Sequence, residues 1–218
     1  MDITAISDLH GFFPKDLPGG DLLIVAGDLT KSDQAWEYID FGAWLNRQSY
    51  KKKVVIAGNH DNIAQNARPF IDPQSEEWEY LCDSGTEFEN LKIFGSPWTL
   101  TFPGINPNCK AFTMDTEEEL AEKWKLIPDD VDILITHGPP YGVLDAIKDH
   151  SGRIIKCVGS KSLQTELFER LNPKLFVCGH IHESYGTEPE GGYIKKAVNC
   201  SHVNERYEPV NKPIRIVL

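Results

Sequence analysis

Histidine, aspartate and asparagine side chains recur in five short motifs, each of which follows an apolar run. The motifs are Asp8-Leu9-His10, Gly27-Asp28, Gly58-Asn59-His60-Asp61, His137-Gly138-Pro139-Pro140 and Gly179-His180-Ile181-His182. Imidazole, carboxylate and amide groups bind Mn²⁺, Fe or Zn²⁺, and the lack of cysteine in these motifs argues against a structural zinc site. The eight candidate ligands exceed the four of one tetrahedral site. We therefore expect two divalent metal ions that share a carboxylate, an arrangement that promotes in-line displacement at phosphorus.

Each motif also has an ordinary structural interpretation. Aspartate is common in turns, as in Gly27-Asp28, and Asn59 could occupy a left-handed turn position. A lone histidine such as His137 is more often a hydrogen-bonded core residue than a ligand. His180 and His182 give a stronger signal, because alternate residues of an extended segment project to the same side. The occurrence of all five motifs in order after apolar runs favours one shared metal centre.

The elements that would position these motifs are short strands alternating with helices. Nearly continuous apolar runs predict strands buried on both faces at residues 3–7, 22–26, 54–57, 131–136 and 175–178. We also expect two short strands around Glu89-Asn90, between residues 85 and 97, and strands at 193–200 and 214–218. Each motif then follows the carboxyl end of a strand, where open α/β sheets bind ligands. The alternation predicts a layered α/β domain over residues 1–218, without distinguishing a sandwich from a single doubly wound sheet.

Helical spacing of apolar residues predicts three helices. The stripes are Trp36, Ile39, Ala43 and Trp44; Leu120, Ala121 and Trp124; and Leu163, Leu167 and Leu171. Ser32 or Asp33 would cap the first helix, and Thr116 with Glu119 would form a capping box for the second. Residues 98–115 form the longest stretch without periodicity, and loops of that length tend to be functional in compact domains.

The composition limits the classes of partner. The chain has 218 residues, of which 22 are Lys or Arg and 33 are Asp or Glu, so its net charge is −11. Nucleic-acid affinity depends on cations that neutralise phosphates, so long nucleic acid is disfavoured while a small phosphate substrate is not. The five cysteines form no CxxC pair and do not resemble a disulfide framework. Without a signal peptide or a run of about 20 apolar residues, the chain is expected to be cytoplasmic, without membrane attachment.

The ordered set D-x-H, G-D, G-N-H-D, H and G-H-x-H resembles the calcineurin-like metallophosphoesterase superfamily. The run from Ile135 to Asp145 is similar to the branch of the metallophosphoesterase-domain-containing proteins, which is related to class III cyclic nucleotide phosphodiesterases. The segments Gly95–Trp98 and Arg206–Asn211 are similar to that branch too. The resemblance extends from Ile3 to Leu218. It implies an α/β fold in four layers, a β-sandwich flanked by α-helices.

The resemblance also implies a role for each ligand. One metal ion would bind Asp8, His10 and His182, the other Asn59, His137 and His180, with Asp28 and a water or hydroxide as bridges. His60 would not bind metal; it would act as a general acid at the leaving oxygen or hydrogen-bond the transferred phosphoryl group. Asp61 would hold the metal-binding residues in place without binding metal itself, or would serve only as a turn or cap residue. The carboxylate that partners the catalytic histidine of protein Ser/Thr phosphatases has no evident counterpart, which argues against that activity and leaves the orientation of His60 unexplained.

The leading hypothesis is hydrolysis of small phosphodiesters, such as cyclic or 2′,3′-cyclic nucleotides, by a metal-bridging hydroxide. Mn²⁺ is the preferred ion, with Fe or Zn²⁺ as alternatives. There are two alternative hypotheses. The first is a phosphomonoesterase or a nuclease that acts on short ends, and the second is a non-catalytic metal-binding scaffold. The scaffold is disfavoured because the chain keeps every ligand and His60. Further candidates for contacts with the substrate are Tyr141, Trp98, Phe102, Lys110 and Arg153.

Overall fold

Two β-sheets packed face to face form the centre of the computed structural model, which describes residues 1–66, 78–102, 108–149, 151–188 and 194–218. The first sheet has the order β15-β1-β2-β3-β4, in which β15 is antiparallel and the other strands are parallel. Its strands are β1 (Asp2–Ile6), β2 (Gly20–Ala26), β3 (Tyr50–Ile56), β4 (Glu79–Tyr80) and β15 (Ile214–Val217).

The second sheet has the order β13-β14-β12-β9-β6-β5, with four parallel strands between two antiparallel edge strands. Its strands are β5 (Ser84–Phe88), β6 (Leu91–Ser96), β9 (Ile133–Thr136), β12 (Leu175–Cys178), β13 (Gly186–Thr187) and β14 (Ala197–Asn199). Two small ribbons pair β7 (Thr99–Leu100) with β8 (Thr113–Met114), and β10 (Ala146–Lys148) with β11 (Ile154–Cys157).

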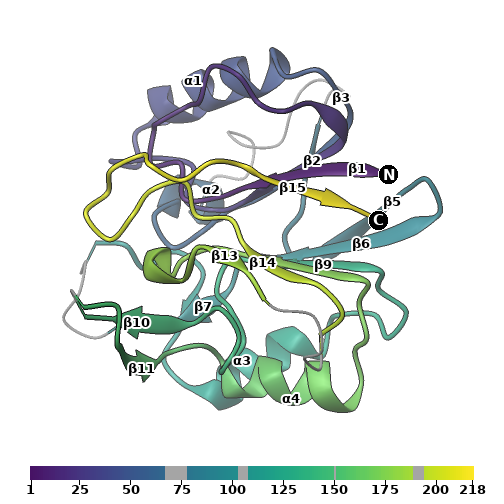
Figure 1. Ribbon diagram of the computed structural model, residues 1–218, viewed down its shortest axis with the longest axis vertical. Helices are drawn as coiled ribbons and strands as arrows, with labels where there is room; N and C mark the ends of the chain where they lie inside the picture. Colours follow the sequence, from purple (N-terminus) through teal and green to yellow (C-terminus); the bar gives the residue numbers. More distant parts are fainter. Residues whose placement is uncertain (67–77, 103–107, 150, 189–193) are drawn as a thin grey trace.

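Helices cover the outer faces of both sheets, which gives four layers (Figure 1). The helices are α1 (Ala35–Asn46), α2 (Asn62–Asn66), α3 (Glu117–Trp124), α4 (Lys161–Glu169) and the 3₁₀ helix η2 (His182–Ser184). On β2, Leu22 and Ile24 pack into the core between the sheets, whereas Leu23 and Val25 pack into the core beneath α1. Successive side chains of a strand point to opposite faces, so these strands are apolar throughout. The expected sandwich flanked by helices is confirmed, and the single doubly wound sheet is not the fold.

The first helix forms where predicted, but its apolar stripe was wrong in part. Trp36 and Ile39 are 60% and 67% exposed, while the buried apolar side chains are Tyr38, Phe41, Trp44 and Leu45. A charged residue sets this rotation of the helix, because the buried Glu37 carboxylate accepts hydrogen bonds from the backbone amides of residues 31, 32 and 34. Charge-assisted hydrogen bonds of this kind are among the stronger ones in proteins.

The capping residue predicted for this helix also differs from the observed one. Gln34, rather than Ser32 or Asp33, is the N-cap of α1. Asp33 instead accepts hydrogen bonds from the hydroxyl of Tyr38 and the amide of Ile63, and so joins α1 to α2. The Thr116–Glu119 capping box of α3 is confirmed.

Most other expected elements are confirmed with somewhat different bounds; β2 and β3 begin earlier than predicted, and β9 begins later. The strand pair around Glu89-Asn90 forms β5 and β6, and both turn residues have positive φ. The strand expected at 193–200 forms only as β14, and Tyr193 lies outside the described residues. All five cysteines are free thiols, as expected.

Candidate metal centre

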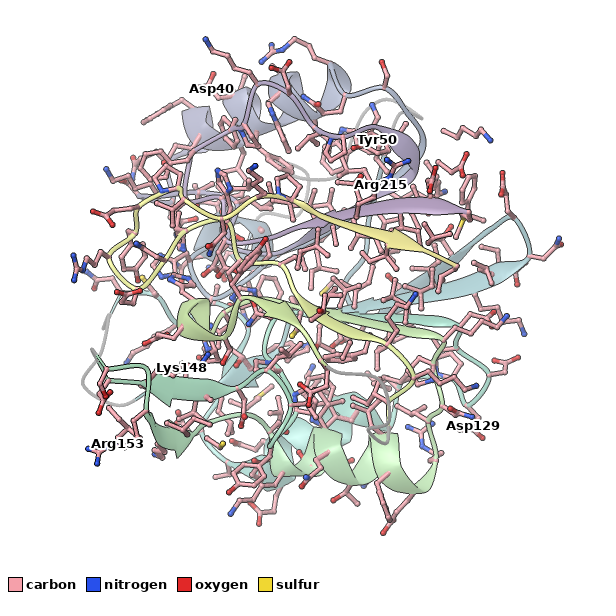
Figure 2. All side chains as sticks on the ribbon, in the orientation of Figure 1. Asp40, Tyr50, Asp129, Lys148, Arg153 and Arg215 are labelled. Atoms are coloured by element: carbon pink, nitrogen blue, oxygen red, sulfur yellow. The ribbon has the colours of Figure 1, made fainter. Side chains whose placement is uncertain are left out.

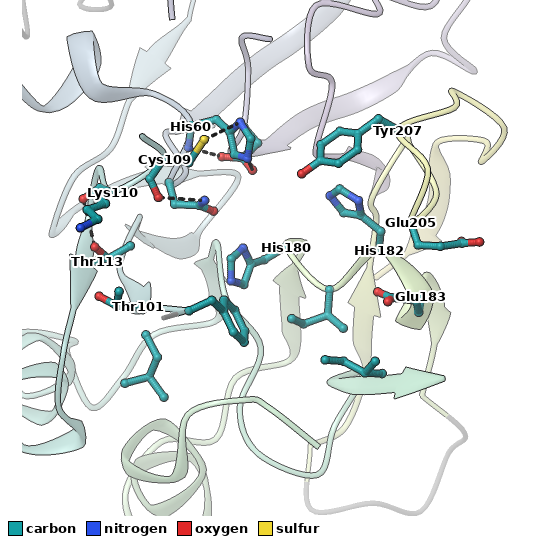
Figure 3. Close-up of a pocket in the computed structure, with 16 residues that line it drawn as sticks. His60, Thr101, Cys109, Lys110, Thr113, His180, His182, Glu183, Glu205 and Tyr207 are labelled. Carbon is teal, nitrogen blue, oxygen red and sulfur yellow. Dashed lines mark hydrogen bonds and ion pairs between the residues drawn. The ribbon is translucent and has the colours of Figure 1, made fainter. Parts of the chain in front are cut away.

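The carboxyl ends of parallel strands from both sheets bring the predicted ligands together. Asp8, Asp28 and Asn59 follow β1, β2 and β3 of the first sheet, whereas His137 and His180 follow β9 and β12 of the second. Since strands that run in parallel end at the same edge, the five sequence-distant motifs meet there. Three of the motifs line one cavity (Figure 3), through Asp28, Asn59, His60, His180 and His182. Asp8, His10 and His137 lie beside them, at 3.0 Å from His182, 3.7 Å from Asp28 and 3.3 Å from Asp28 respectively. The spatial convergence predicted from the sequence is therefore present.

Four of the candidate ligands adopt a left-handed backbone conformation that L-residues rarely occupy. The φ angles of Asp8, His10, Asp28 and His180 are 50°, 44°, 52° and 69°. Such strain clusters at functional sites, where the surrounding structure holds it in place. At these residues the left-handed conformation turns the backbone sharply after the preceding strand, so that the ligand side chain points back toward the neighbouring strand ends.

Glycines beside the ligands allow these loops to approach one another closely. A Cβ atom added to Gly58 would lie 2.3 Å from Oδ1 of Asp28, and one added to Gly179 would lie 2.3 Å from Oδ2 of Asp8. Neither distance is sterically possible, so any larger residue at these positions would displace a candidate ligand. The glycines of the G-N-H-D and G-H-x-H motifs therefore have a structural role.

Asp28 lies at the centre of the cluster. Its Oδ2 atom is 3.3 Å from Nε2 of His137, 3.7 Å from Nε2 of His10 and 4.0 Å from Nε2 of His60. Its Oδ1 atom accepts the backbone N–H of His60 at 2.9 Å. Burial alone would raise the pKa of Asp28, but the surrounding histidines hold it well below the usual value. The group is a buried carboxylate that faces three imidazoles.

The second carboxylate, Asp8, is anchored by its own partners. Nε2 of His182 is 3.0 Å from Oδ1 of Asp8, and the hydroxyl of Ser7 donates to Oδ2 at 2.6 Å. Burial would raise the pKa of Asp8, but the charge and hydrogen bond of His182 lower it below its usual value. The backbone N–H of His180 also donates to this carboxylate, at 3.1 Å to either oxygen.

Backbone carbonyls fix the orientation of two histidines. Nδ1 of His137 lies 2.9 Å from the carbonyl oxygen of Ala26, and Nδ1 of His182 lies 3.1 Å from that of Asn204. Each Nδ1–H can donate to its carbonyl, which directs Nε2 toward the cluster, as in many metal-ligating histidines. Nε2 of His137 is also 3.1 Å from Oδ1 of Asn59. Burial opposes protonation of His137, but Asp28 outweighs it and raises the pKa of the ring to about 9.

Two other histidines provide the test of whether metal ions fit this cluster. The Nε2 atoms of His10 and His180 are buried and have no hydrogen-bond partner among the residues that the structure describes. Burial lowers the pKa of His10 to about 4 and that of His180 to about 3, so both rings are neutral near pH 7. A buried polar atom without a partner is unfavourable, whereas a neutral imidazole nitrogen is a good ligand for a transition-metal ion.

Within the described ranges, three groups of side chains could each hold a metal ion, with ligand atoms within 4.8 Å of one another. The groups are Asp8, His10 and His182; Asp28, His137 and His180; and His10, Asp28 and His60. The first two match the two predicted sets of histidine and carboxylate ligands, and the amide Oδ1 of Asn59 lies 3.1 Å from Nε2 of His137 in the second. The third contains His60, for which we expected no metal contact.

Asp61 connects the loops behind the ligands. It is fully buried and accepts hydrogen bonds from the amides of Leu29, Thr30 and Gly58 at 2.8 to 3.2 Å. Burial and the nearby Asp28 carboxylate raise its pKa to about 7. Asp61 thus ties the loop after β2 to the loop after β3, which places Asp28 beside Asn59.

A cavity of about 310 Å³ opens beside the cluster. Phe102 and Lys110 line it, as expected for contacts with a substrate. Trp98 does not; its indole N–H donates to Asp83, and the Lys123 ammonium lies 3.9 Å from its ring centroid.

The other two candidates for substrate contacts also lie outside the cavity wall. Tyr141 is 37% exposed and lies under the Lys161 ammonium. Arg153 is at the outer edge of the β10–β11 ribbon (Figure 2), where it pairs with Asp149.

The residues of the cavity wall that sequence reasoning missed include Cys109 and Tyr207. The Tyr207 ring centroid is 4.9 Å from that of His10 and 5.3 Å from that of His182, and its hydroxyl points into the cavity (Figure 3). Sγ of Cys109 is 3.3 Å from Nδ1 of His60. The sequence signal for Tyr207 was the similarity of Arg206–Asn211 to a known branch, and that for Cys109 was only its place in the irregular stretch 98–115.

Comparisons with known proteins agree with this geometry. A model of the calcineurin-like phosphoesterase family matches residues 1–184. Metallophosphoesterase domain-containing protein 1 of Homo sapiens is 38% identical over 239 residues, covering 99% of this chain and 70% of that protein, and its Mus musculus counterpart gives the same values. An uncharacterized protein of Methanocaldococcus jannaschii is 30% identical over 204 residues, covering 89% of this chain and 86% of that protein.

Solved structures support the fold. The crystal structure of TT1561 of Thermus thermophilus has a TM-score of 0.57 at 18% identity and covers 91% of this chain and 88% of that chain. No described helix is long and apolar enough to cross a membrane. The chain belongs to the calcineurin-like phosphoesterase family, and the expected resemblance is confirmed.

Proposed function

We propose that this protein hydrolyses small phosphodiesters with two divalent cations held by the candidate metal centre. The observation that carries the proposal is the pair of buried Nε2 atoms of His10 and His180, which have no hydrogen-bond partner among the described residues and each belong to a ligand group with a carboxylate. Asp28 belongs to the group that contains His180, and its Oδ2 atom is 3.3 Å from Nε2 of His137 in that group and 3.7 Å from Nε2 of His10 in the other. Buried polar atoms without a hydrogen bond are rare in folded proteins, and a bound ion is one of the explanations for them.

The proposed ligand sets follow from this arrangement. Asp8, His10 and His182 would hold one ion, Asn59, His137 and His180 the other, and Asp28 would contact both. When bound, the two ions would polarise the phosphoryl oxygens and lower the pKa of a water between them. Mn²⁺ is the ion that we propose, because nitrogen and oxygen ligands without thiolate suit it; Fe and Zn²⁺ accept the same ligands.

The chain's own residues would position the ester and supply a proton. His60 borders the cavity, with Nε2 4.0 Å from Asp28 Oδ2, and would donate a proton to the leaving oxygen. Tyr207 would donate its hydroxyl hydrogen to a phosphoryl oxygen, since that hydroxyl points into the cavity (Figure 3). Phe102 and the ring of Tyr207 offer apolar surface to the ester groups on either side of phosphorus.

The charges around the cavity favour a diester over a monoester. Among the described lining residues, Lys110 is the only lysine or arginine, whereas Glu183 and Glu205 add negative charge. A diester carries one negative charge near pH 7 and a monoester close to two, so the acidic wall repels a monoester more strongly. The size of the cavity, about 310 Å³, suits a small molecule such as a cyclic nucleotide and not a nucleic-acid strand.

The experiment compares two chromogenic substrates on protein loaded with Mn²⁺. We expect bis(p-nitrophenyl) phosphate to be hydrolysed with a higher kcat/KM than p-nitrophenyl phosphate, and two ions to be bound per chain. His180→Asn is the matched variant and should lose both an ion and turnover. A preference for the monoester would support the phosphomonoesterase. Two bound ions without turnover of either substrate would support the non-catalytic scaffold instead.

A further inference from the structure

The two ring nitrogens of His60 face different partners. Nδ1 lies 3.3 Å from Sγ of Cys109, and Nε2 faces the metal centre, 4.0 Å from Oδ2 of Asp28 (Figure 3). The backbone N–H of His60 also donates to Oδ1 of Asp28, which fixes the position of the His60 backbone and thus of its Cα–Cβ bond. The thiol therefore contacts the ring at Nδ1, and Nε2 is the nitrogen that faces Asp28 and the candidate metal centre.

The position usually taken by a carboxylate beside a catalytic histidine is occupied here by the thiol. In the part of the chain that the structure describes, Asp28 is the carboxylate within 4.0 Å of the His60 ring, and it lies on the Nε2 side. We propose that Cys109 is a positioning residue, whose thiol orients His60 so that Nε2–H points at the leaving oxygen. This inference rests on the proposed function of His60 as the general acid.

The thiol sits on backbone that is itself bound to the loop carrying His60. The N–H of Ala111 donates to the carbonyl of Asn59 at 3.2 Å, and the Asn59 amide donates to the carbonyl of Cys109 at 3.4 Å. The Asn62 amide donates to the carbonyl of Asn108 at 3.2 Å. Three contacts thus hold residues 108–111 against residues 59–62, so Sγ has a defined place relative to the ring.

A thiol is suited to both protonation states of the ring. Toward a neutral imidazole the S–H donates to Nδ1, which leaves the ring hydrogen on Nε2; toward an imidazolium the sulfur accepts from Nδ1–H. In both states a hydrogen remains on Nε2, where the leaving oxygen needs it. A carboxylate in the same place only accepts, so in the neutral ring it would favour the hydrogen on Nδ1 and leave Nε2 without one.

The test measures the dependence of rate on the leaving group. Cys109→Ala should lower kcat for diphenyl phosphate by about tenfold, a part of the roughly 10²–10⁴-fold that a positioned acid contributes. The loss should be smaller for bis(p-nitrophenyl) phosphate, because p-nitrophenolate leaves without much help from a proton. KM should change little, and Cys109→Ser, whose hydroxyl donates and accepts similarly, should recover most of the rate.

A double variant distinguishes an effect of Cys109 that acts through His60 from an effect of Cys109 on the fold in general. On a His60→Ala background, Cys109→Ala should cause no further loss, because the thiol has no ring to orient. Cys157→Ala, on β11 and outside the cavity lining, is the matched control and should keep wild-type rates. Equal losses on both backgrounds, or losses that do not depend on the leaving group, would overturn the proposal.

A readout independent of turnover is the tautomer of His60. Long-range ¹H–¹⁵N spectra of the metal-free protein should show the neutral ring with hydrogen on Nε2, and Cys109→Ala should give a mixture of tautomers. An unchanged tautomer in the variant would contradict the inference. The proposed function fails separately, if His60→Ala does not slow diphenyl phosphate more than bis(p-nitrophenyl) phosphate.

Discussion

A buried imidazole nitrogen without a hydrogen-bond partner is unfavourable in a folded protein, yet within the described ranges His10 and His180 each have one in the candidate metal centre. Both rings are held neutral by burial, which lowers their pKa to about 4 and about 3. In the unfolded chain the same rings titrate near the ordinary value of about 6.5. The metal-free fold therefore keeps two ligands ready for a cation and is less stable at low pH as a consequence.

The pH dependence of the free energy of unfolding tests directly whether the His180 ring is neutral in the folded protein. Between about pH 6.5 and pH 3 the unfolded chain binds a proton on this residue that the folded chain does not, so its contribution to stability falls as the pH falls. Each such proton changes the free energy of unfolding by at most about 1.4 kcal/mol per pH unit. Urea unfolding of chelator-treated His180→Asn should show a smaller slope than the wild type between pH 6.5 and 4. Equal slopes would mean that His180 is protonated in the native state.

Tyr207 offers a second test at the scale of one side chain. Tyr207→Phe keeps the ring contacts with His10 and His182 but removes the hydroxyl that points into the cavity. The phosphoryl oxygen belongs to an anion, and loss of a hydrogen bond to a charged group corresponds to about 1.5–3 kcal/mol, so we expect kcat/KM for bis(p-nitrophenyl) phosphate to fall about 10- to 150-fold. Steady-state kinetics at fixed Mn²⁺ measure this. An unchanged kcat/KM would remove Tyr207 from the proposed contacts.

Single residues also show what the sequence could and could not predict. The ligands lie in short motifs beside apolar strands, so local patterns were enough to find them. Cys109 contacts His60 across 49 residues of sequence, and a lone cysteine in an irregular segment carries no local pattern. The orientation of Tyr207 depends on its positive φ of 59°, which the residue type does not indicate. Contacts of this kind follow from loop paths that no periodicity encodes.

At the scale of the elements, the strands were more predictable than the faces of the helices. Strands such as β2 are buried on both faces, so their residues form a nearly continuous apolar run that can be recognised in the sequence. On α1, the exposed Trp36 and Ile39 suggested a wrong face, because the buried Glu37 carboxylate determines which side of the helix turns inward. One buried charge with three backbone donors outweighs two exposed apolar side chains.

The loop after β3 provides a test at this scale. In Gly58→Ala the new Cβ would lie 2.3 Å from Asp28 Oδ1 and 2.7 Å from Cε1 of His137, so the two loops must separate. We expect the variant to lose at least one bound Mn²⁺ and most of its turnover, as measured by metal content and bis(p-nitrophenyl) phosphate assay. Gly42→Ala is the control, since its Cβ on α1 meets nothing within 4 Å. That variant should bind metal normally and gain up to about 1 kcal/mol.

At the scale of the whole molecule, the metal centre spans the two sheets of the sandwich. Asp8, His10, Asp28 and Asn59 follow strands of the first sheet, and His137, His180 and His182 follow strands of the second. In the metal-free chain the same edge is joined by contacts such as Asp8 with His182 and Asp28 with His137. Cations bound there would replace these contacts with stronger ones between the sheets.

Metal binding should therefore stabilise both sheets together. Free Mn²⁺ at 100 times its dissociation constant adds about 2.7 kcal/mol of stability, which raises Tm of a domain this size by roughly 5–10 °C. Calorimetry with and without a chelator measures the shift, and His180→Asn should reduce it. Hydrogen exchange should slow at the carboxyl ends of β1 and β2 and equally at those of β9 and β12, because each sheet supplies ligands. Protection confined to one sheet would contradict a centre shared between them, since ions bound by one sheet alone leave the other free to open.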